Sequence, residues 1–268
     1  MSGEARRERI LDFLCEQETA SLEELARRFG VSKMTIHRDV DRLVEMRCVR
    51  RVRGGVTVLP SVVFESNFTY RQRKNRDAKA ALARRVAELI EPGMTVVLDD
   101  STTTTALADL LPERKPLTVI TNAASLLAGL CRQEDIAVIC PGGRYDPVTD
   151  AFLGLECELA MERLRADLGV FSTAGVHGVS AYLHDNALVR AKLAMKASVD
   201  RAVLAFDHGK FGKSALHFFA RLDAFDHVFT TEGAEPERIE ALLEAGVPVE
   251  LVPLRKTGSA HREERRRA

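Results

Sequence analysis

The sequence predicts an α/β protein in two parts: an N-terminal winged helix-turn-helix and a doubly wound, mostly parallel α/β domain. Two observations predict this division. Before residue 60, two short capped helices precede a glycine-centred hairpin, and after residue 77, strand-like apolar runs alternate with helical ones. A chain of 268 residues is long enough to give the second part a sizeable core.

The composition is that of an ordinary globular protein. Apolar residues make up 46% of the chain, and the formal net charge is zero. There is no apolar run of membrane-spanning length and no signal-peptide pattern in the charged first residues, so we expect a cytoplasmic protein without membrane contact. The five cysteines are scattered and never form a C-x-x-C pair, which predicts buried, reduced thiols. The histidines lack metal-ligand spacing, so we expect no metal and no cofactor.

The N-terminal part reads as three helices. Residues 4 to 17 have apolar side chains at helical spacing and should pack behind the next two helices. Ser21 and Glu24 form a capping-box pattern that starts the second helix, and Gly30 can end it in the left-handed conformation. After a three-residue turn, Ser32 caps the third helix. Two short helices joined in this way are typical of a helix-turn-helix.

The third helix has the features of a recognition helix, which enters the major groove of DNA. Its first two turns present polar and basic side chains. Alternating valines around Gly54 and Gly55 then predict a hairpin, the wing. From Val31 to Gly55, seven Lys or Arg residues oppose three Asp or Glu residues, so this surface is locally basic. The DNA contacts that we predict are Ser32, Lys33, Met34, Thr35, His37, Arg38, Arg42, Arg51 and Arg53. A small helical domain with a solvated face is the alternative, but the capped pair, the turn and the basic hairpin together favour DNA binding.

The boundaries of the parts follow from changes of pattern. Residues 60–77 mix a proline, isolated aromatics and basic residues without steady periodicity, and we interpret them as a linker after a DNA-binding domain at 1–59. Between residues 78 and 254, about seven strands alternate with helices, which predicts one doubly wound domain whose parallel sheet is covered on both faces. The basic tail, 255–268, has the composition of a disordered segment.

In a sheet of this kind, ligands bind beyond the carboxyl ends of the strands. A run of five hydroxyl side chains, Ser101–Thr105, follows Asp99 and Asp100 at the start of a helix, where backbone amides and hydroxyls form a cradle for an anion such as phosphate. Lys210 closes a later strand and could place an ammonium on the same phosphate. Asn122 and the pair Gly142–Gly143 close two further strands. Ordinary helix capping and turn formation remain the alternative explanation for the hydroxyls and the glycines.

Nearly the whole chain resembles the DeoR-type bacterial transcriptional regulators. The resemblance is carried by SLEELARRFGVSKMTIHRDVDRL and RVRGG in the N-terminal part, and by LDDSTTT, VITN, PGG, FLG and FDHGKFG in the C-terminal part. It implies a homo-oligomer, a dimer or tetramer, that binds double-stranded operator DNA. It also implies a C-terminal domain similar in fold to ribose-5-phosphate isomerase, CoA-transferases and glucosamine-phosphate deaminase.

The same resemblance implies that this domain senses a phosphorylated sugar or a related metabolite. The effector contacts that we expect are Asp99, Ser101, Thr102, Thr103, Thr104, Asn122, Gly142, Gly143, Lys192 and Lys210. The chain departs from the family at Ser101, where glycine is usual, and at Leu188–Val189, where a Glu-Ala pair is usual. These departures bear on which metabolite is bound.

Two functions are consistent with these observations. The first is a repressor of a carbohydrate-metabolism operon, relieved when a phosphorylated sugar shifts the protein to a DNA-incompetent arrangement. The alternative is a sugar-phosphate isomerase or deaminase with an appended helical domain, in which Asp99, Asp100 or His177 would act as acid or base. The loop VHGVSAYLHD lacks the close pair of acids that resemblance to the isomerases would require, so the sequence favours the regulator and we predict no catalytic residue.

Overall fold

The computed structural model describes residues 3–45, 48–58, 68–213 and 215–254 of the chain, which divides into two compact units. Unit 1 is Met1–Lys74 and unit 2 is Asn75–Ala268. Each unit encloses buried apolar side chains of its own. Among the described residues, no helix combines the length and the apolar composition needed to cross a bilayer.

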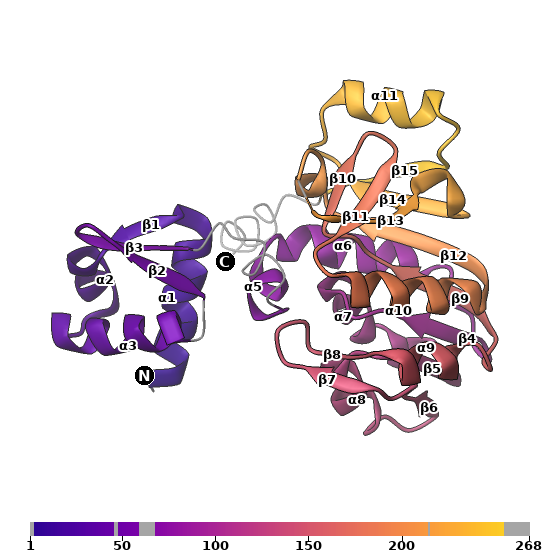
Figure 1. The fold of residues 1–268 in the computed structure, drawn as a ribbon, viewed down its shortest axis with the longest axis horizontal. Coiled ribbons are helices and arrows are strands. Elements are labelled where there is room, and N and C mark those ends of the chain that lie inside the picture. The colour runs from indigo at the N-terminus through magenta and orange to yellow at the C-terminus, as the bar shows by residue number, and fades with distance from the viewer. Residues whose placement is uncertain (1–2, 46–47, 59–67, 214, 255–268) are drawn as a thin grey trace, which may run out of the picture. The chain divides into compact units, whose positions relative to one another are not determined.

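Unit 1 contains the predicted helix pair, a preceding helix and a small antiparallel sheet (Figure 1). Its described helices are α1 (Gly3–Gln17), α2 (Leu22–Phe29), α3 (Lys33–Glu45) and α5 (Phe68–Arg73). Its strands, in the sheet order β1-β3-β2, are β1 (Thr19–Ser21), β3 (Gly55–Val58) and β2 (Val49–Val52). Strands β2 and β3 form the predicted hairpin, and the short β1, which the sequence did not predict, adds a third strand.

The predicted caps of unit 1 are confirmed. The Ser21 hydroxyl accepts a hydrogen bond from the Glu24 amide at 3.1 Å, and Gly30 ends α2 in the left-handed region with a φ of 64°. The Ser32 hydroxyl accepts a hydrogen bond from the Thr35 amide at 3.2 Å at the start of α3. These caps satisfy backbone donors that a helix leaves unpaired at its first turn, and so they fix where each helix begins.

The predicted linker is helical over part of its length. Helix α5 and the first residues of α6 (Arg76–Ala87) lie within 60–77, whereas residues 59–67 lie outside the described residues. Residues 68–77 contain helix-forming Arg, Gln and Lys residues but no apolar stripe, and for that reason periodicity did not reveal α5 or the first two residues of α6. The tail 255–268 also lies outside the described residues.

Unit 2 is built on one parallel sheet of seven strands in the order β15-β14-β12-β9-β4-β5-β6. In chain order, these strands are β4 (Thr95–Leu98), β5 (Leu117–Thr121), β6 (Ile136–Ile139), β9 (Ala166–Phe171), β12 (Val199–Phe206), β14 (His227–Thr231) and β15 (Val249–Val252). All seven were predicted. The order runs outward in both directions from the neighbours β4 and β9, so the topological switch point lies between these two strands.

Helices cover both faces of this sheet, as the continuous apolar strands require. Val96 and Leu98 belong to one core, and Val97 between them belongs to the other, because successive side chains of a strand point to opposite faces. The first core takes side chains from α6, α7 (Thr102–Ala108) and α8 (Ala124–Leu130). The second takes side chains from α9 (Leu155–Met161), α10 (Asn186–Ala197) and α11 (Pro236–Glu244). The doubly wound fold is confirmed.

Two small antiparallel sheets flank the main sheet, and the sequence did not predict them. One is the hairpin of β7 (Arg144–Asp146) and β8 (Ala151–Leu153). The other has the order β10-β11-β13, with β10 (Gly175–His177), β11 (Ser180–Leu183) and β13 (His217–Arg221). Short 3-10 helices occupy Leu111–Glu113, His208–Lys210 and Leu222–Ala224.

The prediction that the cysteines are buried is wrong for two of them. Cys48 and Cys157 are buried, whereas Cys131 and Cys140 are exposed. Cys131 is the C-cap of α8, and Cys140 follows β6, the strand at the edge of the main sheet, so neither lies under a covering layer. The side chain of Cys15 lies outside the described set.

Candidate nucleic-acid interface and strand-edge site

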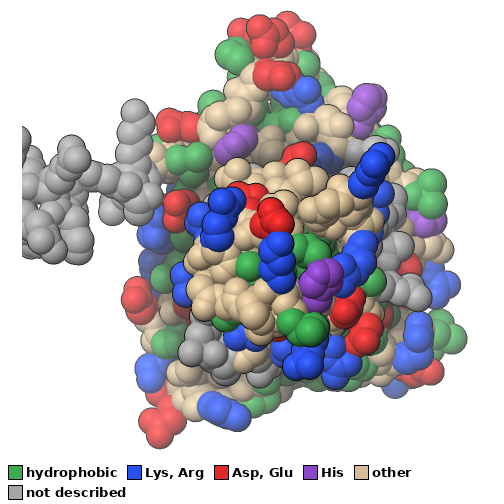
Figure 2. Space-filling model, turned by 90° about the vertical axis from the view of Figure 1, so that its left-hand side faces the viewer, with side chains coloured by type: hydrophobic (Ala, Val, Ile, Leu, Met, Phe, Trp, Pro, Cys, Tyr) green, Lys and Arg blue, Asp and Glu red, His purple; other side chains and the backbone are tan. Residues whose placement is uncertain are grey.

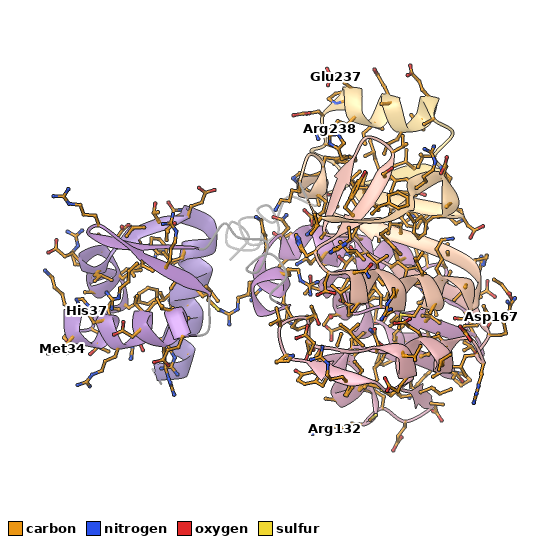
Figure 3. The ribbon with its side chains drawn as sticks, viewed as in Figure 1. Met34, His37, Arg132, Asp167, Glu237 and Arg238 are labelled. Carbon is orange, nitrogen blue, oxygen red and sulfur yellow. The ribbon has the colours of Figure 1, made fainter. Side chains whose placement is uncertain are left out.

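Helix α3 presents an exposed polar and basic face. Ser32, Lys33, His37 and Arg38 are exposed, and Met34 is 67% exposed, which is unusual for a large apolar side chain. Met34 and His37 project from α3 on the side away from the core of unit 1 (Figure 3). Figure 2 shows Lys and Arg side chains on this side of the molecule together with acidic side chains, several of which gather at the top of the view. The face has the chemistry that a DNA groove requires.

Three of the predicted basic contacts are engaged with acidic neighbours. Lys33 pairs with Glu23, Arg42 pairs with Glu45, and Arg51 of the hairpin pairs with Asp41 at 2.6 Å. The hydrogen bond from Lys33 is the largest effect that lowers the pKa of Glu23 below its ordinary value. All three pairs are exposed, so each contributes little to the stability of the unit. Arg38 and Arg53, in contrast, have no acidic partner among the described residues.

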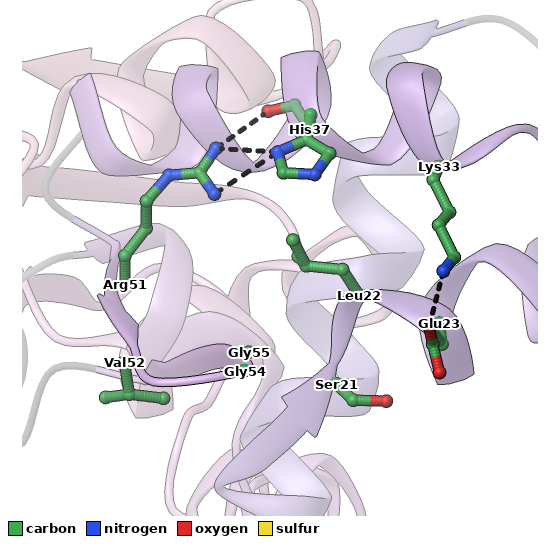
Figure 4. Close-up of a pocket in the computed structure, with 9 residues that line it drawn as sticks. All are labelled: Ser21, Leu22, Glu23, Lys33, His37, Arg51, Val52, Gly54 and Gly55. Carbon is green, nitrogen blue, oxygen red and sulfur yellow. Dashed lines mark hydrogen bonds and ion pairs between the residues drawn. The ribbon is translucent and has the colours of Figure 1, made fainter.

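A hollow of about 500 Å³ lies between α2, α3 and the hairpin (Figure 4). The first residues of α2, Lys33 and His37 of α3, Arg51 and the glycine pair of the hairpin line it. Arg51 reaches across to α3, where its guanidinium lies 3.3 Å from His37 Nδ1. The wing and the recognition helix are therefore joined by a side-chain contact on their exposed face.

One charged residue of α3 is buried, and the sequence analysis missed its partner. Asp39 is 3% exposed and accepts hydrogen bonds from Arg6 at 2.6 and 3.3 Å, with Arg7 at 3.5 Å. These contacts tie α1 to α3 beneath the exposed face. An acid four residues before Leu43 on the apolar stripe was the available signal, because a buried carboxylate needs a cationic partner.

In unit 2, Asp99 joins the two strands at the switch point. It is fully buried at the end of β4, and its Oδ2 accepts a hydrogen bond from the Ser172 amide at 2.8 Å, just beyond the end of β9. Lys192 of α10 donates to the same oxygen at 2.6 Å and to the Ser172 carbonyl at 3.2 Å. Asp100 Oδ1 lies 3.4 Å from the same ammonium. The charge of Lys192 is therefore opposed by two carboxylates.

The hydroxyl run is buried and partly used by the chain itself. Ser101 caps α7 by accepting from the Thr104 amide at 3.2 Å. The Thr104 hydroxyl lies 2.8 Å from the Asp99 carbonyl, to which it donates. The Thr103 hydroxyl lies 3.4 Å from that of Ser172, a residue that the sequence analysis did not single out although it closes β9 as Asp99 closes β4. Capping thus accounts for Ser101 and Thr104, and it leaves Thr102 and Thr103 as the hydroxyls of interest.

Among the described residues, two of the buried acceptors at this edge make no hydrogen bond, although one of them, on Asp100, lies 3.4 Å from the Lys192 ammonium. They are Oδ1 of Asp100 and Oδ1 of Asn122, which follow the neighbouring strands β4 and β5. The amide of Asn122 is oriented by its own hydrogen bond, since Nδ2 donates to the Phe152 carbonyl at 3.2 Å. Unsatisfied buried acceptors are uncommon and indicate a place where a ligand or water donates.

The other predicted residues lie further along the same edge. Gly142 and Gly143 follow β6 with φ values of 80° and 109°. A Cβ on Gly143 would lie 2.6 Å from the Leu153 carbonyl oxygen. The packing of the backbone therefore requires a glycine here, whether or not a ligand binds. On the other side, half-buried Lys210 follows β12 in a short helix that Asp207 caps. Asp207 Oδ1 also accepts a hydrogen bond from Asn75 Nδ2 at 2.6 Å.

Within the part of the chain that the structure describes, no cluster of three or more His, Cys, Asp or Glu side chains is arranged to hold a metal ion. His177, a candidate acid or base, is exposed in β10, and Asp99 is committed to Lys192 and Ser172.

Both units match known families. Residues 6–62 match the family described as a DeoR-like helix-turn-helix domain, and residues 74–232 match the DeoR C terminal sensor domain.

Three relatives that match most of this chain are named as transcriptional regulators. The glycerol-3-phosphate regulon repressor of Escherichia coli (strain K12) is 29% identical over 252 residues, covering 94% of this chain and 100% of that protein. The L-fucose operon activator of Haemophilus influenzae is 30% identical, covering 84% of this chain and 90% of that protein. The transcriptional repressor AccR of Agrobacterium fabrum is 29% identical, covering 87% and 91%.

Among solved structures, ribose 5-phosphate isomerase A from Methanocaldococcus jannaschii is similar to part of the chain. It is 14% identical with a TM-score of 0.38, covering 52% of this chain and 55% of that chain.

Proposed function

Because the chain belongs to the DeoR family of DNA-binding transcriptional regulators, we propose that it represses a carbohydrate-metabolism operon and is released by a phosphorylated sugar. The chain is a regulator and not an isomerase or deaminase, since its relatives along the full length are named as regulators. The single observation that carries DNA recognition is the capped helix α3 with its exposed polar and basic face. The glycerol-3-phosphate repressor among its relatives supports a sugar-related effector.

The proposed effector site lies at the carboxyl edge of the main sheet, around the switch point between β4 and β9. The buried acceptors of Asp100 and Asn122 suit the hydroxyl groups of a sugar. The phosphate would lie at the amides and hydroxyls of Thr102 and Thr103, with Lys210 as its cation. Asp99 and Lys192 hold the edge in shape through their hydrogen bond.

The proposed mechanism is a shift between two arrangements of a homo-oligomer. A dimer or tetramer that binds two operator half-sites gains affinity through effective concentration, so any change in the relative placement of its DNA-binding units weakens binding steeply. Effector binding would favour the arrangement that cannot engage both half-sites. We expect the protein to act in the cytoplasm, where it meets both DNA and phosphorylated sugars.

The test uses the full chain in two steps. A thermal-shift screen with glycerol 3-phosphate, ribose 5-phosphate and glucosamine 6-phosphate identifies a compound that stabilises the protein. That compound is then added to a gel-shift assay with the DNA directly upstream of the gene that encodes this protein. The Lys210→Ala variant should bind the same DNA with unchanged affinity and should not be released by the compound. The proposal of sugar-phosphate sensing fails if no phosphorylated sugar stabilises the protein or if the variant is released like the parent protein.

A further inference from the structure

The contact between the wing and the recognition helix restricts the chemistry of His37. Arg51 Nη1 and Nη2 lie 3.3 and 3.4 Å from His37 Nδ1, and Nη2 also lies 3.5 Å from the His37 carbonyl oxygen (Figure 4). Asp41, one turn further along α3, accepts from Arg51 Nη2 at 2.6 Å and from Nε at 3.2 Å. Three groups of one helix therefore hold a single guanidinium in place.

A guanidinium has only donors, so the ring nitrogen that faces it must accept. The proton of the neutral imidazole then lies on Nε2, because each neutral ring has one donor and one acceptor. A doubly protonated ring would place an N–H group against the N–H groups of Arg51, which is unfavourable. With Nδ1 occupied, His37 can offer DNA only the Nε2–H donor from its exposed position on α3.

We propose that His37 is a specificity-determining residue that donates from Nε2 to guanine in the major groove, and that Arg51 is the residue that positions it. This inference rests on the DNA-binding part of the proposed function. Guanine presents two neighbouring acceptors, N7 and O6, whereas cytosine presents a donor and adenine places a donor beside its acceptor. A group that can only donate therefore favours guanine and disfavours cytosine at the base pair that it meets.

The same hollow is a poor site for a bound anion. Its two cations, Lys33 and Arg51, pair with Glu23 and Asp41, so these four side chains together carry no net charge. A phosphate placed there would have to displace both carboxylates. The geometry favours a positioning role for Arg51 over a role as a phosphate ligand, although the sequence alone predicted only that Arg51 contacts DNA.

The base preference is measured by selecting binders from a duplex library with a randomised central segment, using the full chain. We expect the parent protein to select guanine at one base pair that the His37→Gln variant shifts toward adenine, because an amide both donates and accepts. Arg51→Gln should relax the preference at that same base pair by about tenfold and leave the other positions unchanged. Arg53→Gln, which removes the same charge from the same hairpin, is the matched control and should weaken binding to all sequences alike.

The tautomer is measured independently of DNA by the ¹⁵N chemical shifts of the His37 ring in the free protein. We expect Nδ1 of the parent protein to carry no proton. In Arg51→Gln, the two neutral tautomers of the ring should both be populated. A protonated Nδ1 in the parent protein overturns the inference. So does an unchanged base preference in His37→Gln, or identical effects of Arg51→Gln and Arg53→Gln. If the parent protein selects no sequence at all, the DNA-binding proposal itself fails.

Discussion

Lys192 illustrates how the partners of a residue decide its role. A lysine at a ligand-binding edge suggests an anion contact, yet this ammonium is 2.6 Å from Asp99 and 3.4 Å from Asp100, at 2% exposure. Two carboxylates already bind this ammonium, so little of its charge is available to an anion, and the group suits the hydroxyls of a ligand better. Arg51 follows the same logic at the DNA face, where Asp41 takes up its charge. The sequence shows that such a residue is cationic. Only the three-dimensional structure shows that a neighbouring carboxylate already binds the cation.

Burial should protect two cysteines from alkylation. It raises the pKa of the Cys157 thiol to about 11 and is also the main cause of the raised pKa of Cys48. At pH 8 both groups remain protonated, and the thiolate is the reactive form. Iodoacetamide followed by peptide mass mapping should therefore label the exposed Cys131 and Cys140 and spare the other two. Labelling of Cys157 as fast as that of Cys131 would contradict its position in the core.

Arg38 should contribute directly to operator binding. It is exposed on α3 and has no acidic partner among the described residues, so its full charge is available to DNA. We expect Arg38→Ala to raise the dissociation constant for DNA by about tenfold without changing the response to a stabilising sugar phosphate. The matched control is Arg132→Ala, an exposed arginine of unit 2 (Figure 3). Equal gel-shift affinities for the two variants would remove Arg38 from the interface.

The sequence predicted the strands that form long apolar runs, but it did not predict the shortest strands. The inner strands of the main sheet are largely buried on both faces and so appear as continuous apolar segments. The edge strands β6 and β15 are partly exposed but are still mostly apolar in sequence. The three-residue strands β1 and β10 are too short to show an alternation. β1 forms by pairing with β3, which is distant in the chain, and β10 forms by pairing with the adjacent β11. Within α3, Val44 is 37% exposed because it lies about 80° around the helix from the buried Ile36. Its neighbour Leu43 lies within about 20° of Ile36 and is buried.

The buried ion pair between α1 and α3 should support the whole of unit 1. Removing the carboxylate by Asp39→Ala leaves Arg6, whose side chain is 13% exposed, without its partner, which costs about 3 kcal/mol. In calorimetry of the full chain, the midpoint temperature for unfolding of unit 1 should fall by roughly 12–24 °C, since 1 kcal/mol corresponds to about 4–8 °C in a unit of this size. The midpoint temperature of unit 2 should not change. Glu45→Ala, which breaks an exposed pair on the same helix, should change stability by less than about 1 kcal/mol. Similar shifts for both variants would mean that the buried pair stabilises no more than a surface pair.

At the scale of the whole molecule, the sequence predicted that the candidate residues lie at the carboxyl edge of the main sheet. It did not predict how far apart they lie along that edge. The candidate residues follow five adjacent strands, β6-β5-β4-β9-β12. At the usual strand spacing, the two outer strands are roughly 19 Å apart, which exceeds the length of a pentose phosphate. Gly142 and Lys210 close these two outer strands, so they cannot both be central to one small ligand. Strand order depends on long-range pairing, which no local pattern in the sequence records.

Asn75 is placed to connect the proposed effector site with the point where the chain enters unit 2. It is the first residue of that unit, it adopts a φ of 53°, and its side chain donates to Asp207 Oδ1 at 2.6 Å. Asp207 in turn caps the short helix that contains Lys210. A movement of this loop on effector binding would therefore act on the residue that follows Lys74, the last residue of unit 1.

Asn75→Gly should uncouple effector binding from DNA release. Glycine adopts positive φ without strain, so the substitution removes the hydrogen bond to Asp207 and leaves the backbone as it is. The thermal shift caused by the sugar phosphate should persist, whereas the ratio of the DNA dissociation constants with and without it should fall toward 1, because coupling is a free energy separate from either affinity. Asp135→Gly, which replaces another residue of positive φ (64°) in unit 2, is the matched control and should keep the ratio of the parent protein. If Asn75→Gly is still released from DNA to the same extent, the signal passes through another contact, and the Asn75–Asp207 hydrogen bond serves only to hold the loop.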